Sequence, residues 1–178
     1  MKQQRFGLFI MTLFLLTNCL SSDKSLQVVP EVDLSRYLGK WYEIATIPAR
    51  FQLGCHCVTA EYSLLKKGRI RVINSCRKDS ADGPFRSVKG QAKVVKGSNN
   101  AKLKVSFFRP FWGDYWIINL DQENYQWAVV SSPSRKYLWI LSRTPEMDEA
   151  LYEQLVEHCQ SVGLNTDLLV KTDQSCHM

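Results

Sequence analysis

Hydrophobic and polar residues alternate with a period of two along most of the chain between residues 40 and 143. Such alternation places successive side chains on opposite faces of a β-strand. The alternating segments are short, and turns rich in Gly, Asn, Asp and Ser separate them. Since each strand has one apolar face to bury, the pattern predicts an antiparallel meander that forms either a sandwich or a barrel. The eight predicted strands cover residues 40–47, 58–65, 70–74, 88–94, 103–107, 115–120, 125–131 and 137–143.

The period changes to that of a helix after residue 143. Thr144 is expected to cap this helix, with Pro145 at its first position, and Gly163 is expected to end it. The apolar residues that recur at helical spacing are Met147, Leu151, Leu155 and Cys159. We therefore expect one amphipathic helix on the outside of the sheet, followed by a short final strand at 168–172.

The N-terminus has the pattern of an export signal. Lys2 and Arg5 precede an apolar run over residues 6–16, which is long enough for a signal peptide and too short to span a bilayer. The run ends in Leu16-Thr-Asn-Cys19, which resembles the signal of bacterial lipoproteins, in which this cysteine is lipidated and becomes the first residue. Because Asn18 stands where that signal usually has a smaller residue, cleavage near Cys19 without a lipid is the alternative.

This signal predicts the organisation and the location of the protein. Residues 1–18 are expected to be a lipoprotein-type signal peptide, 19–31 a polar tether and 32–176 the folded domain. The lipid on Cys19 would anchor the protein to the periplasmic face of the cell outer membrane; without it the protein is expected in the periplasm. The net charge of +6 comes from scattered lysines and arginines, so we expect no nucleic-acid partner.

The chain has six cysteines, and five remain if Cys19 carries a lipid. Two disulfides and one free thiol are the simplest account in an oxidising compartment. A metal site at Cys55-His-Cys57 is the alternative, but these residues lie closer together than the usual zinc spacing. We therefore predict disulfides, with no metal and no cofactor.

The order of eight strands, one late helix and a final strand resembles the lipocalin family. Gly39-Lys-Trp41 resembles its Gly-x-Trp motif, residues 120–125 with Asp121 resemble its second motif, and residues 138–145 with Arg143 resemble its third. Residues 37–44 and 105–111 are similar to the bacterial branch close to apolipoprotein D. The resemblance implies an all-β fold, an eight-stranded antiparallel up-and-down β-barrel with a C-terminal α-helix.

The motif residues are expected to be structural. An arginine at the end of the last barrel strand can lie over the indole of Trp41 and close the base of the barrel through a cation–π contact. The four residues in this group are Gly39, Trp41, Asp121 and Arg143. The family resemblance also implies a disulfide from Cys57 to the C-terminal Cys176, with Cys55–Cys76 as our second pair and Cys159 left as a buried thiol.

Alternation predicts which side chains face the interior. The residues that we expect to contact a ligand are Tyr62, Phe107, Tyr115, Ile117, Tyr137, Trp139 and Leu141. A ligand in this lining would be largely apolar, with tyrosine hydroxyls and Asn119 as polar contacts. The resemblance implies a fatty acid or lysophospholipid, carried or stored at the outer membrane, with a role in membrane maintenance under stress.

Three other interpretations remain open from the sequence. The barrel could be filled by its own side chains, which would make the protein structural. It could be a lipid-modifying enzyme that uses a cavity thiol at Cys76, although the chain lacks a Gly-x-Ser-x-Gly elbow and no histidine is placed as a base. The aromatic segment at 107–112 could border the mouth, contact a membrane or join two chains in a homodimer.

Overall fold

The computed structural model describes residues 25–177, so the predicted signal peptide and Cys19 lie outside the described residues. The strands are β1 (Gly39–Thr46), β2 (Cys55–Leu64), β3 (Ile70–Lys78), β4 (Phe85–Val94), β5 (Lys102–Ser106), β6 (Gly113–Leu120), β7 (Trp127–Ser131), β8 (Leu138–Ser142) and β9 (Val170–Lys171). The helices are α1 (Leu34–Tyr37) and α2 (Glu149–Ser161), with single 3-10 turns at Arg50–Gln52, Lys66–Gly68, Thr166–Leu168 and Ser175–His177.

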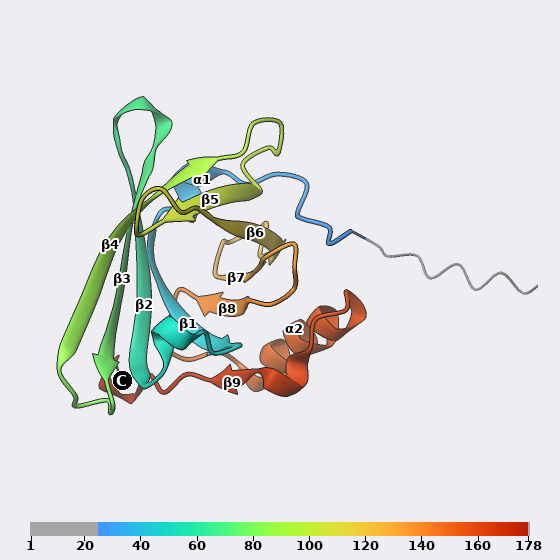
Figure 1. Cartoon of the computed structure of the whole chain (residues 1–178). Helices are drawn as coiled ribbons and strands as arrows, with labels where there is room; N and C mark the ends of the chain where they lie inside the picture. Colours follow the sequence, from blue (N-terminus) through green and yellow to red (C-terminus); the bar gives the residue numbers. More distant parts are fainter. Residues whose placement is uncertain (1–24, 178) are drawn as a thin grey trace, which may run out of the picture.

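Strands β1 to β8 form a closed antiparallel barrel (Figure 1). Each strand pairs with the next one along the chain, and β1 pairs with both β8 and β2, which closes the ring. The predicted barrel is therefore confirmed over the sandwich. The ninth strand adds to β1, where Ala45 lies opposite Lys171.

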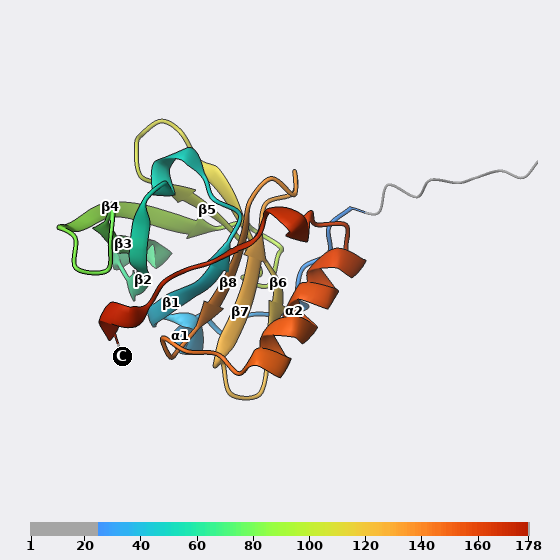
Figure 2. The same cartoon turned by 90° about the horizontal axis from the view of Figure 1, so that it is seen from below.

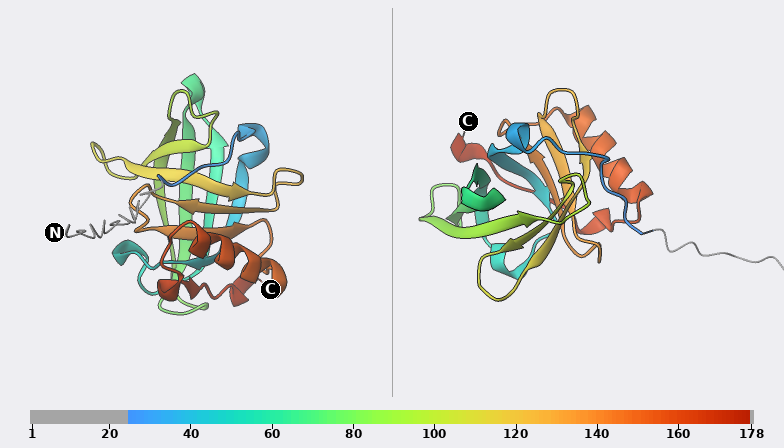
Figure 3. Two further views of the ribbon diagram at one scale, coloured as in Figure 1. Left: turned by 90° about the vertical axis from the view of Figure 1, so that its right-hand side faces the viewer. Right: turned by 90° about the horizontal axis from the view of Figure 1, so that it is seen from above.

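The two faces of the barrel wall bury two separate sets of apolar side chains. The inner set includes Trp41, Tyr62, Val72, Ala92 and Ile117, all within the barrel. The outer set lies between the wall and α2, and includes Ile118, Val129, Ile140, Leu155 and Cys159. Helix α2 therefore packs outside the barrel, as its helical spacing of apolar residues predicted, and Figures 2 and 3 show it against the strands β6 to β8.

Helix α2 begins four residues later than the sequence pattern suggested. Asp148 is its N-cap, and its carboxylate accepts a hydrogen bond from Leu151 N–H at 3.0 Å. Thr144 instead donates its hydroxyl to the Glu146 carbonyl at 2.7 Å, so it caps nothing. The helix ends as expected before Gly163, which has a φ of +79°. None of the helices in residues 25–177 has the length and apolarity needed to cross a bilayer.

Several other boundaries differ from the prediction. Strands β3 and β4 extend further, to Lys78 and from Phe85, because they pair along their whole length. Tyr125 belongs to the β6–β7 turn, with a φ of +58°, and not to β7. The expected strand at 168–172 is reduced to the two residues of β9, because a 3-10 turn occupies Thr166–Leu168.

The segment before α1 packs against the barrel. Leu26 and Val29 are buried, and Val29 N–H donates to the Ile117 carbonyl at 3.0 Å. Val32 N–H donates to the Asn99 carbonyl in the β4–β5 turn. The interval 19–31, expected to be a polar tether, is therefore in contact with the wall from Leu26 onward.

Candidate functional site

One end of the barrel is closed by Trp41 and Arg143. Trp41 in β1 is fully buried, and the Arg143 guanidinium lies 3.7 Å from the centroid of its ring. The indole N–H donates to the Tyr37 carbonyl at 2.8 Å, which fixes the ring against α1. The cation–π contact expected from the sequence is present at the base of the barrel.

Arg143 also joins segments that are far apart in the sequence. Its guanidinium donates to four backbone carbonyls, those of Arg36, Leu38, Lys40 and Tyr125, at 2.6 to 3.2 Å. Gly39 has a φ of +94°, and a Cβ there would lie 3.4 Å from Arg143 Nη1. The glycine of the first motif therefore supplies both the left-handed backbone and the space for the arginine.

Asp121 holds the turn that covers this base. Its carboxylate accepts the backbone N–H groups of Glu123, Asn124 and Gln126 at 3.0 to 3.2 Å. This arrangement shapes the β6–β7 turn, in which the Tyr125 hydroxyl accepts Asp33 N–H at 2.9 Å. Asp121 therefore has a local structural role in the second motif.

Three tyrosines form a floor above the tryptophan. The hydroxyls of Tyr37 and Tyr115 share a hydrogen bond of 2.8 Å, and Tyr62 donates to Tyr115 at 3.0 Å. Burial raises the pKa of Tyr62 to about 12, and it raises the pKa values of Tyr37 and Tyr115 well above their usual range. These hydroxyls are neutral and already bonded to one another, so they are not the free polar contacts that we expected.

The opposite end of the barrel leaves inward-facing side chains accessible. Ala60, Asn74 and Val88 lie in one row across β2, β3 and β4, in register with the inner core. Val88 is 38% exposed, and Tyr137, immediately before β8, is 39% exposed. Tyr137 stacks on Trp139, with ring centroids 5.7 Å apart. This accessible end, which we call the mouth, lies between the loops 47–54, 79–84, 107–112 and 132–137.

The seven residues predicted to contact a ligand fall into two groups. Ile117 and Leu141 are packed in the inner core, where Tyr62 and Tyr115 form the floor. Phe107, Tyr137 and Trp139 keep exposed surface near the mouth. A glycine at position 90 makes room for Phe107, because a Cβ there would lie 2.7 Å from its ring.

The structure changes the assignment of two polar residues to the interior. Asn119 was expected inside, but a bulge between Ile117 and Asn119 places it opposite Val129, on the outer side. Asn74 lies inside instead, and its buried Oδ1 makes no hydrogen bond. Asn74 is the last residue of the predicted third strand, and alternation with the inward Ile70 and Val72 could have identified it.

A buried carboxyl group lies beside the mouth, at a position that was not among the predicted site residues. Glu43 in β1 is 4% exposed and lies opposite Leu141. It accepts hydrogen bonds from Gln52 Nε2 and Thr172 Oγ1, both at 2.8 Å. Gln52 also accepts the Trp139 indole N–H at 3.2 Å, so Glu43 connects the mouth to the C-terminal segment. Burial raises the pKa of Glu43 above its ordinary value of 4.5.

The raised pKa of Glu43 predicts a dependence of stability on pH. Because the folded state favours the neutral acid, the stabilisation that protonated Glu43 contributes is fully present below pH 4.5. This stabilisation is lost as the pH rises through the raised pKa. Glu43→Gln is expected to remove this part of the decline in folding stability with rising pH. Urea denaturation between pH 4.5 and 8 measures it, with Glu61→Gln on the outer face of β2 as the control. An equal decline in Glu43→Gln and the native protein would contradict this origin.

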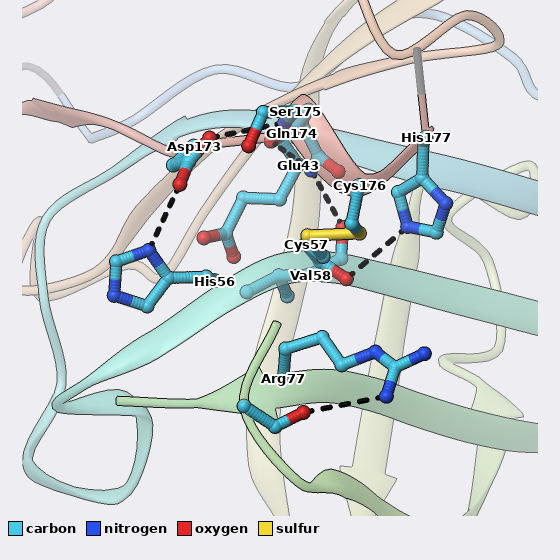
Figure 4. The surroundings of a disulfide bond; sticks show 11 residues. Glu43, His56, Cys57, Val58, Arg77, Asp173, Gln174, Ser175, Cys176 and His177 are labelled. Atoms are coloured by element: carbon cyan, nitrogen blue, oxygen red, sulfur yellow. Dashed lines mark hydrogen bonds and ion pairs between the residues drawn. A yellow bond between two sulfur atoms is a disulfide. The ribbon is translucent and has the colours of Figure 1, made fainter. Parts of the chain in front are cut away.

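The C-terminal segment seals the seam where β1 and β2 diverge (Figure 4). Gln174 is buried, and its side-chain amide donates to the carbonyls of Glu43 in β1 at 2.8 Å and Val58 in β2 at 2.9 Å. Cys57 N–H donates to the Asp173 carbonyl, and a disulfide joins Cys57 to Cys176. The tail therefore takes the place of strand pairing at this seam.

The remaining cysteines bear on the enzyme interpretation. A second disulfide joins Cys55 to Cys76, so both pairings are those expected from the sequence. Cys159 is free but buried between α2, to which it belongs, and the barrel wall, and burial raises the pKa of its thiol to about 12. Neither Cys76 nor Cys159 presents a thiolate to the interior, so the thiol mechanism lacks its nucleophile.

Within residues 25–177, one group of potential metal ligands has its donor atoms close together. It consists of Cys57, Cys176 and His177. Two of its three donor atoms are the sulfurs of a disulfide, which do not act as thiolate ligands. His56 from the earlier Cys-His-Cys cluster pairs with Asp173 at 3.2 Å. The donor set therefore does not fit a metal site while the disulfide is intact.

Comparison with known proteins agrees with this architecture. Residues 32–174 match the family model of the lipocalin-like domain. The chain is 40% identical over 160 residues to outer membrane lipoprotein Blc of Vibrio cholerae, covering 90% of this chain and 93% of that protein. It is 39% identical over 152 residues to mouse apolipoprotein D, covering 80% and 77% of the two chains. The solved structure of insecticyanin from the tobacco hornworm aligns with a TM-score of 0.68 at 19% identity, covering 86% and 87%. The chain therefore belongs to the lipocalin family, in the branch that includes the Blc lipoproteins and apolipoprotein D.

Proposed function

We propose that the protein binds one small, largely apolar molecule through the mouth of the barrel and carries or stores it at the outer membrane. A fatty acid or a lysophospholipid fits this proposal. The supporting observation is that Val88 faces inward by register yet stays 38% exposed, and that Tyr137, stacked on the inward Trp139, stays 39% exposed. An interior that was filled along its whole length would bury both side chains.

The depth of the barrel limits what part of a ligand can enter. The floor is occupied by Tyr37, Tyr62 and Tyr115, whose hydroxyls are already paired. An acyl chain would therefore lie above the tyrosines, against Ala60, Phe107 and Trp139. Burial of apolar surface supplies about 25 cal/mol per Å², which is the main driving force for such a ligand.

The mouth offers polar contacts for the other end of the ligand. The buried Oδ1 of Asn74 makes no hydrogen bond and would accept one from a ligand hydroxyl. Leaving such an acceptor unpaired costs about 1–3 kcal/mol, so a ligand hydroxyl that donates to it adds favourable binding free energy. A lysophospholipid, which carries a glycerol hydroxyl next to its acyl chain, satisfies this requirement better than a fatty acid does.

The location at the outer membrane rests on different evidence. Relatives of this chain are named outer membrane lipoproteins, and the sequence has a lipoprotein-type signal that ends at Cys19. We propose that Cys19 is lipidated and that residues 19–25 connect the anchor to the packed segment. A periplasmic orientation, a role in membrane maintenance and a homodimer joined through the exposed Phe108 and Phe111 stay predictions.

A substitution at the mouth tests the proposal. Val88→Trp would fill the space above the floor, and it is expected to reduce binding of palmitate and of a lysophosphatidylethanolamine at least tenfold. The reduction follows because the ligand and the indole cannot occupy the same volume. Native mass spectrometry of delipidated protein measures the bound fraction without interference from the added tryptophan.

The matched control is Ser87→Trp. Ser87 is the neighbouring residue of β4 and lies opposite Ser75 on the outer face, so the same indole there should leave binding unchanged. Unaltered binding by Val88→Trp, or no binding of either lipid by the native protein, would overturn the proposal.

A further inference from the structure

A second pocket lies on the outer wall of the barrel, and Phe107 lies between it and the proposed lipid site. It has a volume of about 440 Å³. Arg71, Gln91 and Ser106 line it, and they form one row across β3, β4 and β5. The neighbouring row of Ile70, Ala92 and Val105 belongs to the inner core, so the pocket faces outward. In Figure 1, β3 and β4 run side by side at the left of the barrel.

Positive charge converges on this pocket. Arg71, Lys89 and Arg109 are among its lining residues. Arg69 Nη1 and Arg109 Nη2 both donate to one acceptor, Gln91 Oε1, at 3.2 and 3.1 Å. Two guanidinium groups that share a single neutral oxygen repel each other, and an anion between them would relieve this repulsion.

No acid of the described chain neutralises this cluster. The ion pairs within residues 25–177 do not include Arg69, Arg71, Lys89 or Arg109. Glu61 of β2 lies on the same outer row as Lys89, with Ile73 between them, and it makes no ion pair within 4 Å. The pocket therefore has several donors and an excess of positive charge.

An independent feature of the pocket also indicates a ligand. Ser106 is 7% exposed although it faces outward, and its buried Oγ makes no hydrogen bond. A buried hydroxyl without a partner is costly, and native proteins rarely retain one without a reason. An acceptor oxygen in the pocket would satisfy this hydroxyl.

We infer that this pocket on the β3–β5 wall binds a phosphate group or a similar oxyanion. Guanidinium groups bind tetrahedral oxyanions through charge-assisted hydrogen bonds, and Ser106 and Lys89 add further donors. The volume exceeds that of a single phosphate, and Leu65 and Phe107 line the remainder, so a phosphate ester with a small carbon moiety also fits. The two sources of this group are free phosphate and the headgroup of a lipid.

Titration calorimetry at constant ionic strength tests the inference, with inorganic phosphate and glycerol 3-phosphate as separate probes. The native protein should bind at least one probe saturably, at one site per chain. Tighter binding of glycerol 3-phosphate would identify an organic phosphate or a lipid headgroup, and equal or tighter binding of inorganic phosphate would identify the free anion. No saturable binding of either probe would overturn the inference.

Substitutions locate the site. Arg109→Gln should weaken binding at least tenfold, since a hydrogen bond to a charged partner is lost. Ser106→Ala should weaken it several-fold without lowering the melting temperature, because the substitution removes a hydroxyl that has no partner in the empty pocket. A purely structural serine would instead lower the melting temperature and leave phosphate binding unchanged.

Charge-matched variants separate a site from a general effect of net charge. Arg71→Gln with Lys89→Gln should abolish saturable binding. Lys96→Gln with Lys136→Gln removes the same charge from two exposed turns and should change the affinity less than twofold. Equal losses in the two double variants would contradict a defined site. Val88→Trp, which blocks the mouth, should retain phosphate binding, so this inference and the proposed lipid site can fail independently.

Discussion

Replacing Cys57 and Cys176 together with serine is expected to lower the free energy of unfolding by about 5 kcal/mol. The disulfide joins residues 119 positions apart, and the chain-entropy estimate grows with the length of the closed loop. The link also holds the tail on the seam between β1 and β2, where Gln174 bonds to both strands. For a chain of this length, such a loss corresponds to a melting temperature about 10–20 °C lower.

The other disulfide provides the control for this experiment. Cys55 and Cys76 are only 21 positions apart, so their replacement by serine should cost about 3 kcal/mol on the same estimate. Urea denaturation of both double variants measures the difference. A larger cost for the shorter loop would show that loop length does not control the stabilisation.

Replacing Arg143 with alanine is expected to lower the free energy of unfolding by about 3–5 kcal/mol. The substitution removes the cation–π contact with Trp41, worth about 0.5–2 kcal/mol, and four donors to backbone carbonyls. Hydrogen bonds to charged groups contribute about 1.5–3 kcal/mol each when taken singly, and they are not additive in one network. The base of the barrel should therefore become its weakest part.

Arg143→Lys separates the charge from the shape of the guanidinium. Lysine keeps a cation near the indole, but it cannot reach carbonyls in α1, β1 and the β6–β7 turn at once. We expect about half of the loss seen with alanine, measured as the shift of the urea midpoint. An unchanged melting curve for Arg143→Ala would contradict a structural role for this residue.

Part of the candidate site could be predicted from the sequence, because local alternation assigns most strand residues to a face. Tyr62, Phe107 and Trp139 were expected to face inward and do so. Alternation does not measure depth, however, so it could not distinguish Ile117 in the packed core from Tyr137 at the mouth. Depth depends on how far each strand extends along the barrel and on which loops cover it.

Bulges explain the clearest errors in assigning residues to a face of the barrel wall. A single extra residue between Ile117 and Asn119 places Asn119 on the outer side. Another irregularity between Glu43 and Ala45 accompanies the burial of a carboxyl that we did not expect. Neither bulge has a signature in the sequence, since each is decided by pairing with a neighbouring strand.

The sequence by itself determined the barrel, the outer helix and the residues that close the base. Period-two alternation over eight segments and the Gly-x-Trp and arginine motifs are local patterns. Such patterns can be recognised in the sequence without knowledge of the fold. Only the tertiary structure decided that the tail seals the seam at Glu43, that three tyrosines satisfy one another and that basic residues surround Ser106 on the outer wall. These features depend on contacts between residues that are distant in the sequence, and burial and electrostatics act on distances in space.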